Sequence, residues 1–209
     1  MLNPKDSEKL KMAKKESTFG NMLLALSLIS LVSSTTLGFV YEFTKEPIRL
    51  VEINRTNSAI QAVVPEFDNE PATEGYNVPC DRDSLRFYPA RKNGVLVGTA
   101  VETYTNKGFS GLIKLMVGFA PDGSITDISV LQHQETPGLG DKIDKKKSGF
   151  SLQFQGKNPS DFKLLVRKDR GDVDAITAST ISSRAFCDAV QRAYDAYIAD
   201  KGLNKLMGK

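Results

Sequence analysis

The longest hydrophobic stretch of the chain lies near its N-terminus. No residue of Ser17–Tyr41 is charged, and its core, Met22–Val32, is apolar on nearly every face of a helix. About 20 apolar residues are enough to cross a ~30 Å hydrocarbon layer. We therefore predict a transmembrane helix over residues 19–41, preceded by a basic N-terminal segment, residues 1–18.

The flanks of this stretch predict its orientation. Lysines crowd the N-terminal side, while Phe39, Tyr41 and Phe43 mark the other end. Cationic flanks tend to stay in the cytoplasm, so the basic N-terminus is predicted to be cytoplasmic and the residues from about 42 onward to lie across the membrane. A cleaved signal peptide has the same polarity. Ser34–Gly38 offers no good small-x-small cleavage site, which favours an uncleaved anchor.

A connecting region, residues 42–84, follows the anchor. Apolar residues recur at helical spacing over residues 45–64, namely Ile48, Val51, Ala59, Ile60, Val63 and Val64. Pro65 ends the pattern, so an amphipathic helix is expected up to that point. Residues 66–84 contain Pro71, Gly75 and Pro79 among acidic residues and asparagines, a composition typical of a loop.

Strand patterns then follow one another along the chain. Two hairpins are predicted around the turns Lys92–Gly94 and Pro121–Gly123, with strands at Leu85–Ala90, Val95–Tyr104, Leu112–Phe119 and Ser124–Gln132. A fifth strand is expected at Phe162–Val166 and a final helix at about Ile181–Ala199. Mostly antiparallel strands with flanking helices define an α+β fold.

One predicted strand has apolar residues on both faces. In Leu112–Phe119 the two sets of alternating side chains differ only weakly in polarity. A strand with this pattern is expected to be covered on both faces of its sheet.

Composition excludes some classes of function. The net charge of +3 arises largely from the first 18 residues, and the nearly neutral remainder argues against nucleic acid as the main partner. Two cysteines, Cys80 and Cys187, cannot form a four-cysteine zinc or iron–sulfur site. They leave open a disulfide or two ordinary thiols, since spacing does not determine the Cα separation. No metal site and no catalytic residue is predicted.

Two glycine-containing loops are candidate ligand contacts. In His133–Gly140, Pro137 fixes φ, while Gly138 and Gly140 permit positive φ or close approach of a planar ring beside Leu139. In Lys107–Gly111, the glycines again allow close approach, and Phe109 is available for ring contact. Composition alone favours a wide turn in the first case and a flexible loop in the second.

A third loop, Asp174–Thr180, enters the final helix. Five hydroxyl side chains lie within seven residues, namely Thr177, Ser179, Thr180, Ser182 and Ser183. Serine and threonine are favoured as helix N-caps, which is one interpretation. The other is an anion site, because a helix N-terminus offers free N–H groups and partial positive charge to a phosphate.

Taken together, the three loops resemble those of the FMN-binding domain shared by RnfG, of the Rnf electron-transport complex, and NqrC, of the sodium-pumping NADH:quinone reductase. The family pattern is Gly-aromatic-Ser/x-Gly, then Glu-Thr-Pro-Gly-Leu-Gly, then Asp-x-x-Thr/Ser-Gly-Ala-Thr before a helix. In this chain the same order is found in Gly108–Gly111, Glu135–Gly140 and Asp174–Thr180. The resemblance spans about residues 45–199, and the preceding anchor also fits it.

The resemblance implies FMN joined covalently, through its phosphate, to Thr180 by a separate flavin transferase. The FMN-binding domain would be residues 85–200, followed by a basic tail, residues 201–209. Residues bordering the flavin or supporting its loop would be Gly108, Phe109, Gly111, Glu135, Thr136, Pro137, Gly138, Leu139, Gly140, Asp174, Thr177, Ala178 and Ser179. Ala178 and Ser179 replace the usual Gly-Ala, and the methyl group of Ala178 disfavours a left-handed backbone there.

The implied function is electron relay within a membrane-bound, ion-translocating oxidoreductase. Its partners would be the other membrane, iron–sulfur and flavin subunits, the transferase and the lipid bilayer. The resemblance places it in the bacterial inner membrane as a single-pass protein, with its flavin domain on the periplasmic side. Its length suits the RnfG type better than the usually longer NqrC type. A membrane-anchored flavin redox sensor and a flavin-free scaffold are the alternatives.

Overall fold

The computed structural model describes residues 18–80 and 83–206, with side chains up to residue 202. The chain divides into two compact units, Met1–Val51 and Glu52–Lys209. Apart from Thr18, the predicted basic N-terminus lies outside the described residues, and so do the last three residues of the tail.

The predicted anchor and the predicted amphipathic helix form one continuous helix, α2 (Phe19–Val63), with Pro47 inside it. Among the described helices, α2 is long and apolar enough to cross a membrane. The hydroxyls of Thr35, Thr36 and Thr44 each donate to the carbonyl oxygen four residues earlier, at 2.7–2.9 Å. Such bonds satisfy polar side chains within the helix itself, as a lipid environment requires.

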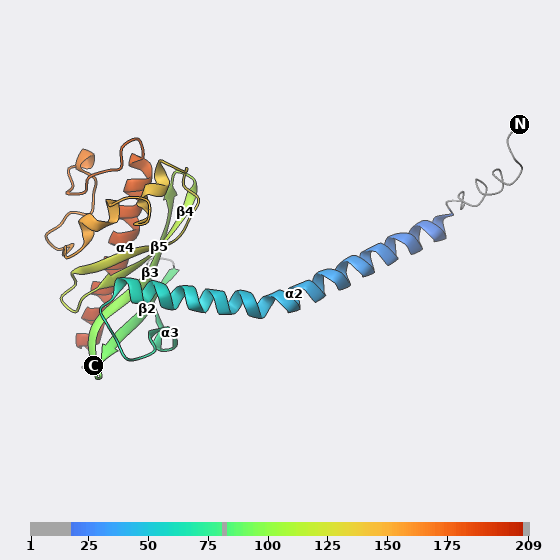
Figure 1. Ribbon diagram of the computed structural model, residues 1–209, viewed down its shortest axis with the longest axis horizontal. Helices are drawn as coiled ribbons and strands as arrows, with labels where there is room; N and C mark the ends of the chain where they lie inside the picture. Colours follow the sequence, from blue (N-terminus) through green and yellow to red (C-terminus); the bar gives the residue numbers. More distant parts are fainter. Residues whose placement is uncertain (1–17, 81–82, 207–209) are drawn as a thin grey trace, which may run out of the picture. The chain divides into compact units, whose positions relative to one another are not determined.

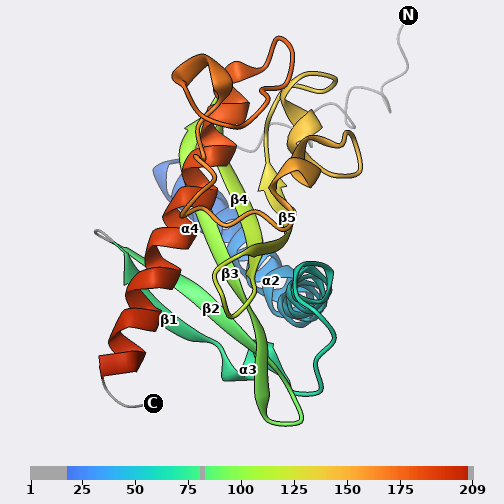
Figure 2. The same ribbon diagram turned by 90° about the vertical axis from the view of Figure 1, so that its left-hand side faces the viewer.

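The second unit is built on a five-stranded antiparallel sheet whose strands follow one another in sequence order. The strands are β1 (Tyr76–Cys80), β2 (Asp83–Lys92), β3 (Val95–Gly108), β4 (Gly111–Phe119) and β5 (Ile125–His133). The long helix α4 (Thr180–Leu206) lies across one face of this meander, as Figures 1 and 2 show. The predicted α+β class with an antiparallel sheet is confirmed.

Both faces of the sheet are covered, and the alternation along each strand decides which core a side chain joins. Leu115 and Val117 of β4 belong to the core beneath α4, whereas Met116 between them belongs to a second core with Ile60 and Val63 of α2. Period-two alternation explains this division. It confirms the prediction that this strand is covered on both sides.

Two contacts tie the helices to the sheet. A Cβ at Gly118 of β4 would lie 1.8 Å from the Val63 carbonyl oxygen, so only glycine lets the end of α2 approach so closely. On the other face, the Thr103 hydroxyl of β3 donates to the Ala189 carbonyl of α4 at 3.0 Å. The end of β3 that carries Gly108 is thereby held beside α4.

Both predicted hairpins are present. Asn93 and Gly94 have φ values of +52° and +78°, as a tight two-residue turn between β2 and β3 requires. Gly123, at φ +92°, closes the turn between β4 and β5, where its N–H donates to the Ala120 carbonyl at 2.9 Å.

Two predictions about local structure are wrong. The segment expected to be loop contains the short helix α3 (Pro71–Glu74) and the edge strand β1, because β2 offers a complete set of partners to Tyr76–Cys80. The predicted strand Phe162–Val166 is not a strand. Its backbone groups bond instead to residues 172 and 173, for example from Val173 N to Leu165 O at 3.0 Å.

The apolar residues of the predicted amphipathic helix are buried only near its C-terminal end. Ala59, Ile60, Val63 and Val64 are buried, but Ile48 and Val51 are exposed.

Cys80 and Cys187 are both free thiols, so the disulfide is not formed. Cys187 is buried in the core beneath α4. Desolvation raises the pKa of its thiol to about 12, because burial disfavours the thiolate.

Candidate functional site

The three loops singled out in the sequence meet in one pocket of about 330 Å³. It lies where β3 turns into β4, where the segment after β5 begins, and where α4 begins. The lining residues are Phe109, Glu135, Thr136, Leu139, Gly140, Ala178, Ser179, Thr180, Ile181 and Ser182. A pocket of this size lies at the lower end of the range for small-molecule sites, about 300–1,000 Å³.

The hydroxyls of Thr180 and its neighbour Ser179 lie in different surroundings. Ser179 is buried, at 8% exposure, and its Oγ donates to the Ser182 Oγ at 2.9 Å. Thr180 is half-buried and lines the pocket as the first residue of α4. Of the two residues, Thr180 is therefore the more accessible to solvent.

The start of α4 is held by a local cap. The Ser179 carbonyl accepts the first helical bond, from Ser183 N at 3.1 Å, and the Ser183 hydroxyl also donates to that carbonyl, at 2.9 Å. The same hydroxyl accepts from Ile176 N at 2.9 Å. The loop is thus fixed against the helix. The N–H groups of the first turn of α4 lack helical partners and point toward the end of the helix at which the pocket lies.

Ala178 has a left-handed backbone, with φ +61°. The methyl group of Ala178 disfavours this conformation, yet the residue adopts it, because the surrounding cap determines the path of the chain. A non-glycine residue in this region costs about 1–2 kcal/mol. The loop that presents Thr180 is therefore strained at one residue.

Glu135 is a buried carboxylate at the base of the pocket, with 4% exposure. Its Oε1 accepts from Ser110 N at 3.0 Å, and its Oε2 accepts a short hydrogen bond from the Ser182 hydroxyl. Glu135 therefore links all three loops: its own, the β3–β4 turn and the start of α4.

The rim of the pocket is apolar. Phe109, Leu139 and Ile181 line it while remaining 68%, 42% and 48% exposed, respectively. Large exposed apolar side chains around a pocket favour a ligand with an apolar surface.

Six of the predicted site residues do not line the pocket, namely Gly108, Gly111, Pro137, Gly138, Asp174 and Thr177. The glycines shape the surrounding loops: Gly111 and Gly138 adopt φ values of +98° and +75°. Asp174 is exposed and pairs with Arg167, with 2.6 Å between Oδ1 and Nε.

Sequence reasoning assigned no role beside the flavin to three residues of the site and its support, although it counted Ser182 among the five hydroxyls. Ile181 and Ser182 line the pocket, and Gln153 holds the third loop by accepting from Asp174 N at 2.8 Å. The signal for Ser182 was its position three residues after Ser179, a spacing that places two side chains on one helix face. Gln153 gave no such signal, because it lies 21 residues from its partner.

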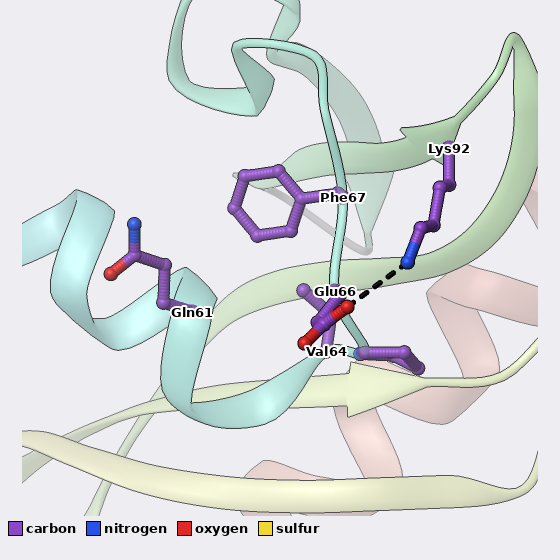
Figure 3. A pocket seen from close by; sticks show the side chains of 6 residues that line it. Gln61, Val64, Glu66, Phe67 and Lys92 are labelled. Atoms are coloured by element: carbon purple, nitrogen blue, oxygen red, sulfur yellow. Dashed lines mark hydrogen bonds and ion pairs between the residues drawn. The ribbon is translucent and has the colours of Figure 1, made fainter.

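A second pocket, of about 440 Å³, lies near the opposite end of β3 and contains none of the predicted site residues. Figure 3 shows its lining side chains, with Lys92 Nζ donating to Glu66 Oε2 at 3.0 Å on one side of Phe67 and Gln61 on the other. This ion pair is exposed to solvent and contributes little. The convergence of three loops makes the pocket at Thr180 the candidate site.

Comparison with known proteins identifies the class of this domain. The family described as FMN-binding domain matches residues 108–195, a range that holds all three pocket loops. The protein thus contains an FMN-binding domain.

Similar proteins specify the family. Proteins named as the G subunit of the ion-translocating oxidoreductase complex, from Vibrio cholerae serotype O1 (strain M66-2) and Vibrio atlanticus (strain LGP32), are 34% and 36% identical to it. These alignments cover 82% and 81% of this chain and 87% and 86% of the relatives, respectively. The protein of the same name from Shewanella baltica (strain OS223) is 36% identical over 179 residues. The chain belongs to this RnfG family, which confirms the resemblance seen in its motifs.

Proposed function

We propose that this chain is an FMN-carrying electron-relay component of an ion-translocating oxidoreductase, with FMN bonded through its phosphate to Thr180. The observation that carries the proposal is the position of Thr180. Thr180 is half-buried and lines a pocket formed by all three loops, which lie within the range that matches the FMN-binding domain. RnfG relatives over four-fifths of the chain support the assignment to such a complex.

The residues present suit FMN. The apolar rim of Phe109, Leu139 and Ile181 can pack against a planar ring. The N-terminus of α4 offers free N–H groups and partial positive charge where a phosphate joined to Thr180 would lie. When bound, FMN supplies the redox chemistry, for which the protein side chains provide position and electrostatics.

Attachment requires a hydroxyl that another enzyme can reach. In the proposed reaction the Thr180 Oγ1 forms a bond to the phosphorus of the FMN portion of FAD. The pyrophosphate bond of FAD breaks, AMP leaves, and the hydroxyl proton passes to a base of the flavin transferase. Thr180 is accessible for this reaction, whereas Ser179 is buried and its hydroxyl is occupied by Ser182. Thr177 is exposed but does not line the pocket.

The membrane arrangement is part of the proposal. Residues 19–41 would anchor the chain in the bacterial inner membrane, residues 42–84 would connect the anchor, and residues 85–200 would carry FMN on the periplasmic side, before the tail at 201–209. The uncharged segment of α2 and the lysines preceding it support this orientation. Protease added to spheroplasts should then degrade the flavin domain; protection of that domain would contradict the orientation.

Intact mass tests the central claim. The full chain, co-expressed with a flavin transferase and purified in detergent, should carry the added mass of FMN minus water. Fragmentation should place this adduct on Thr180. A chain with only the mass of its amino acids, from cells in which another flavinylated protein is modified, would overturn the proposal.

A further inference from the structure

In the described part of the chain, the buried Glu135 carboxylate has no ion-pair partner. Among the described residues, its hydrogen-bond partners are the neutral donors Ser110 N and Ser182 Oγ. None of the ion pairs in the described part of the chain includes it, and the nearby Lys107 pairs with Asp188 at 2.6 Å. Both carboxylate oxygens therefore accept hydrogen bonds from uncharged groups.

Two glycines make room for this carboxylate. A Cβ at Gly108 would lie 2.7 Å from Glu135 Oε1, and a Cβ at Gly140 would lie 2.7 Å from Glu135 Oε2. Any larger residue at either position would displace the side chain or the loop. The backbone of two separate loops is thus shaped around one acidic group.

The carboxylate belongs to the same small pocket as Thr180. Ser182 also accepts from Ser179, the residue before Thr180, so a chain of three side chains fixes Glu135 relative to the proposed attachment point. A charge in a partly buried pocket is screened less than one in water and acts strongly on its neighbours.

We propose that Glu135 is a positioning residue that sets the reduction potential of the flavin by holding a fixed negative charge beside it. This inference rests on the proposed function. An electron added to the flavin makes it more negative, so a neighbouring carboxylate opposes reduction. The potential is therefore lower with Glu135 than with a neutral residue of the same shape.

Glu135→Gln tests the charge while retaining the shape. The amide oxygen can still accept from Ser110 N, and the amide nitrogen can donate to the Ser182 oxygen. The matched control is Glu66→Gln, the same chemical change at a solvent-exposed carboxylate in the other pocket. The full flavinylated chain in detergent is titrated with dithionite against a reference dye at about pH 8.5, well above the ordinary titration range of a glutamate.

The expected result is a more positive midpoint potential for Glu135→Gln and an unchanged potential for Glu66→Gln. A Glu135→Gln chain that binds flavin with the wild-type potential would overturn the inference, and so would one that folds but takes up no flavin. Absence of flavin from the wild-type chain would instead overturn the proposed function.

A second variant decides the matter if Glu135→Gln does not fold. Ser182→Ala keeps the carboxylate but removes one of its two donors, leaving its charge less compensated. Its midpoint potential should shift to more negative values, opposite to the shift for Glu135→Gln. An unchanged or more positive potential would overturn the inference, since a purely structural role predicts no such opposition.

Discussion

Ser179 and Thr180 are adjacent in the chain and both line the pocket, but Ser179 is buried whereas Thr180 is half-buried. Ser179 lies beneath the loop, bonded to Ser182, at the position that caps α4. The same short segment therefore supplies a structural hydroxyl at Ser179 and, in the proposed function, the acceptor hydroxyl at Thr180, so substitutions at the two positions should have different effects.

Thr180→Ala should abolish covalent flavin and leave the fold intact. The substitution removes the acceptor oxygen but not the cap, which belongs to Ser179 and Ser183, so the loss of stability should be about 1 kcal/mol or less. Flavin fluorescence on a denaturing gel and the thermal midpoint measure the two effects. Thr177→Ala, which changes a hydroxyl outside the pocket, is the matched control and should keep the fluorescent band. A band retained in Thr180→Ala would assign the acceptor elsewhere.

Gly140→Ala should destabilise the second unit. The added methyl group would lie 2.7 Å from both Glu135 Oε2 and Ser182 Oγ, an overpacked arrangement that costs about 1–3 kcal/mol. Gly149→Ala is the control, because its methyl group would meet Leu152 at an ordinary 3.5 Å. Urea unfolding of both variants gives the comparison. Equal stabilities would show that Glu135 and Ser182 move aside without a loss of folding free energy.

Ala178→Gly should stabilise the protein by about 0.5–1 kcal/mol. It relieves the left-handed strain at φ +61°, and this gain exceeds the added freedom of the unfolded chain. Ala175→Gly, three residues earlier and outside the positive-φ region, should lower stability instead. The difference between the two midpoints in urea is the measurement. A loss of stability in Ala178→Gly would mean that the loop is not strained.

The stability of the protein should fall as the pH rises above 9, in part because of Cys187. Its folded-state pKa of about 12 exceeds the usual value of 9.0, so the native state keeps the proton while the unfolded state loses it. This contribution is fully present below pH 9 and is lost as the pH rises toward 12.

Cys187→Ala should therefore flatten the decline of the unfolding free energy between about pH 8 and pH 10, although its baseline is lower because of the lost volume. Val190→Ala, also buried on α4 but not titratable, should lower the baseline and keep the wild-type slope. Identical slopes for wild type and Cys187→Ala would refute the role of this thiol.

Local chemistry was sufficient to predict several elements from the sequence. Asn93-Gly94 allows the positive φ values of a tight hairpin turn. The uncharged residues 19–41 are long and apolar enough for a membrane-spanning helix, and they are helical. The order of the three loops also identified which family the chain belongs to. These features depend on residues close together in the chain.

Only the tertiary structure decided which segments pair as strands and which residues far apart in the sequence are in contact. Tyr76–Cys80 forms a strand because it pairs with the edge of β2. The backbone of Phe162–Val166 instead forms hydrogen bonds with residues 172 and 173. Likewise, Glu135 and Ser182 are 47 residues apart, and no local preference brings them together. The sequence alone determined which hydroxyls, glycines and acids the site could use. Packing determined that Ser179 is buried and Thr180 is more exposed, since burial depends on the sheet and helix that surround the loop.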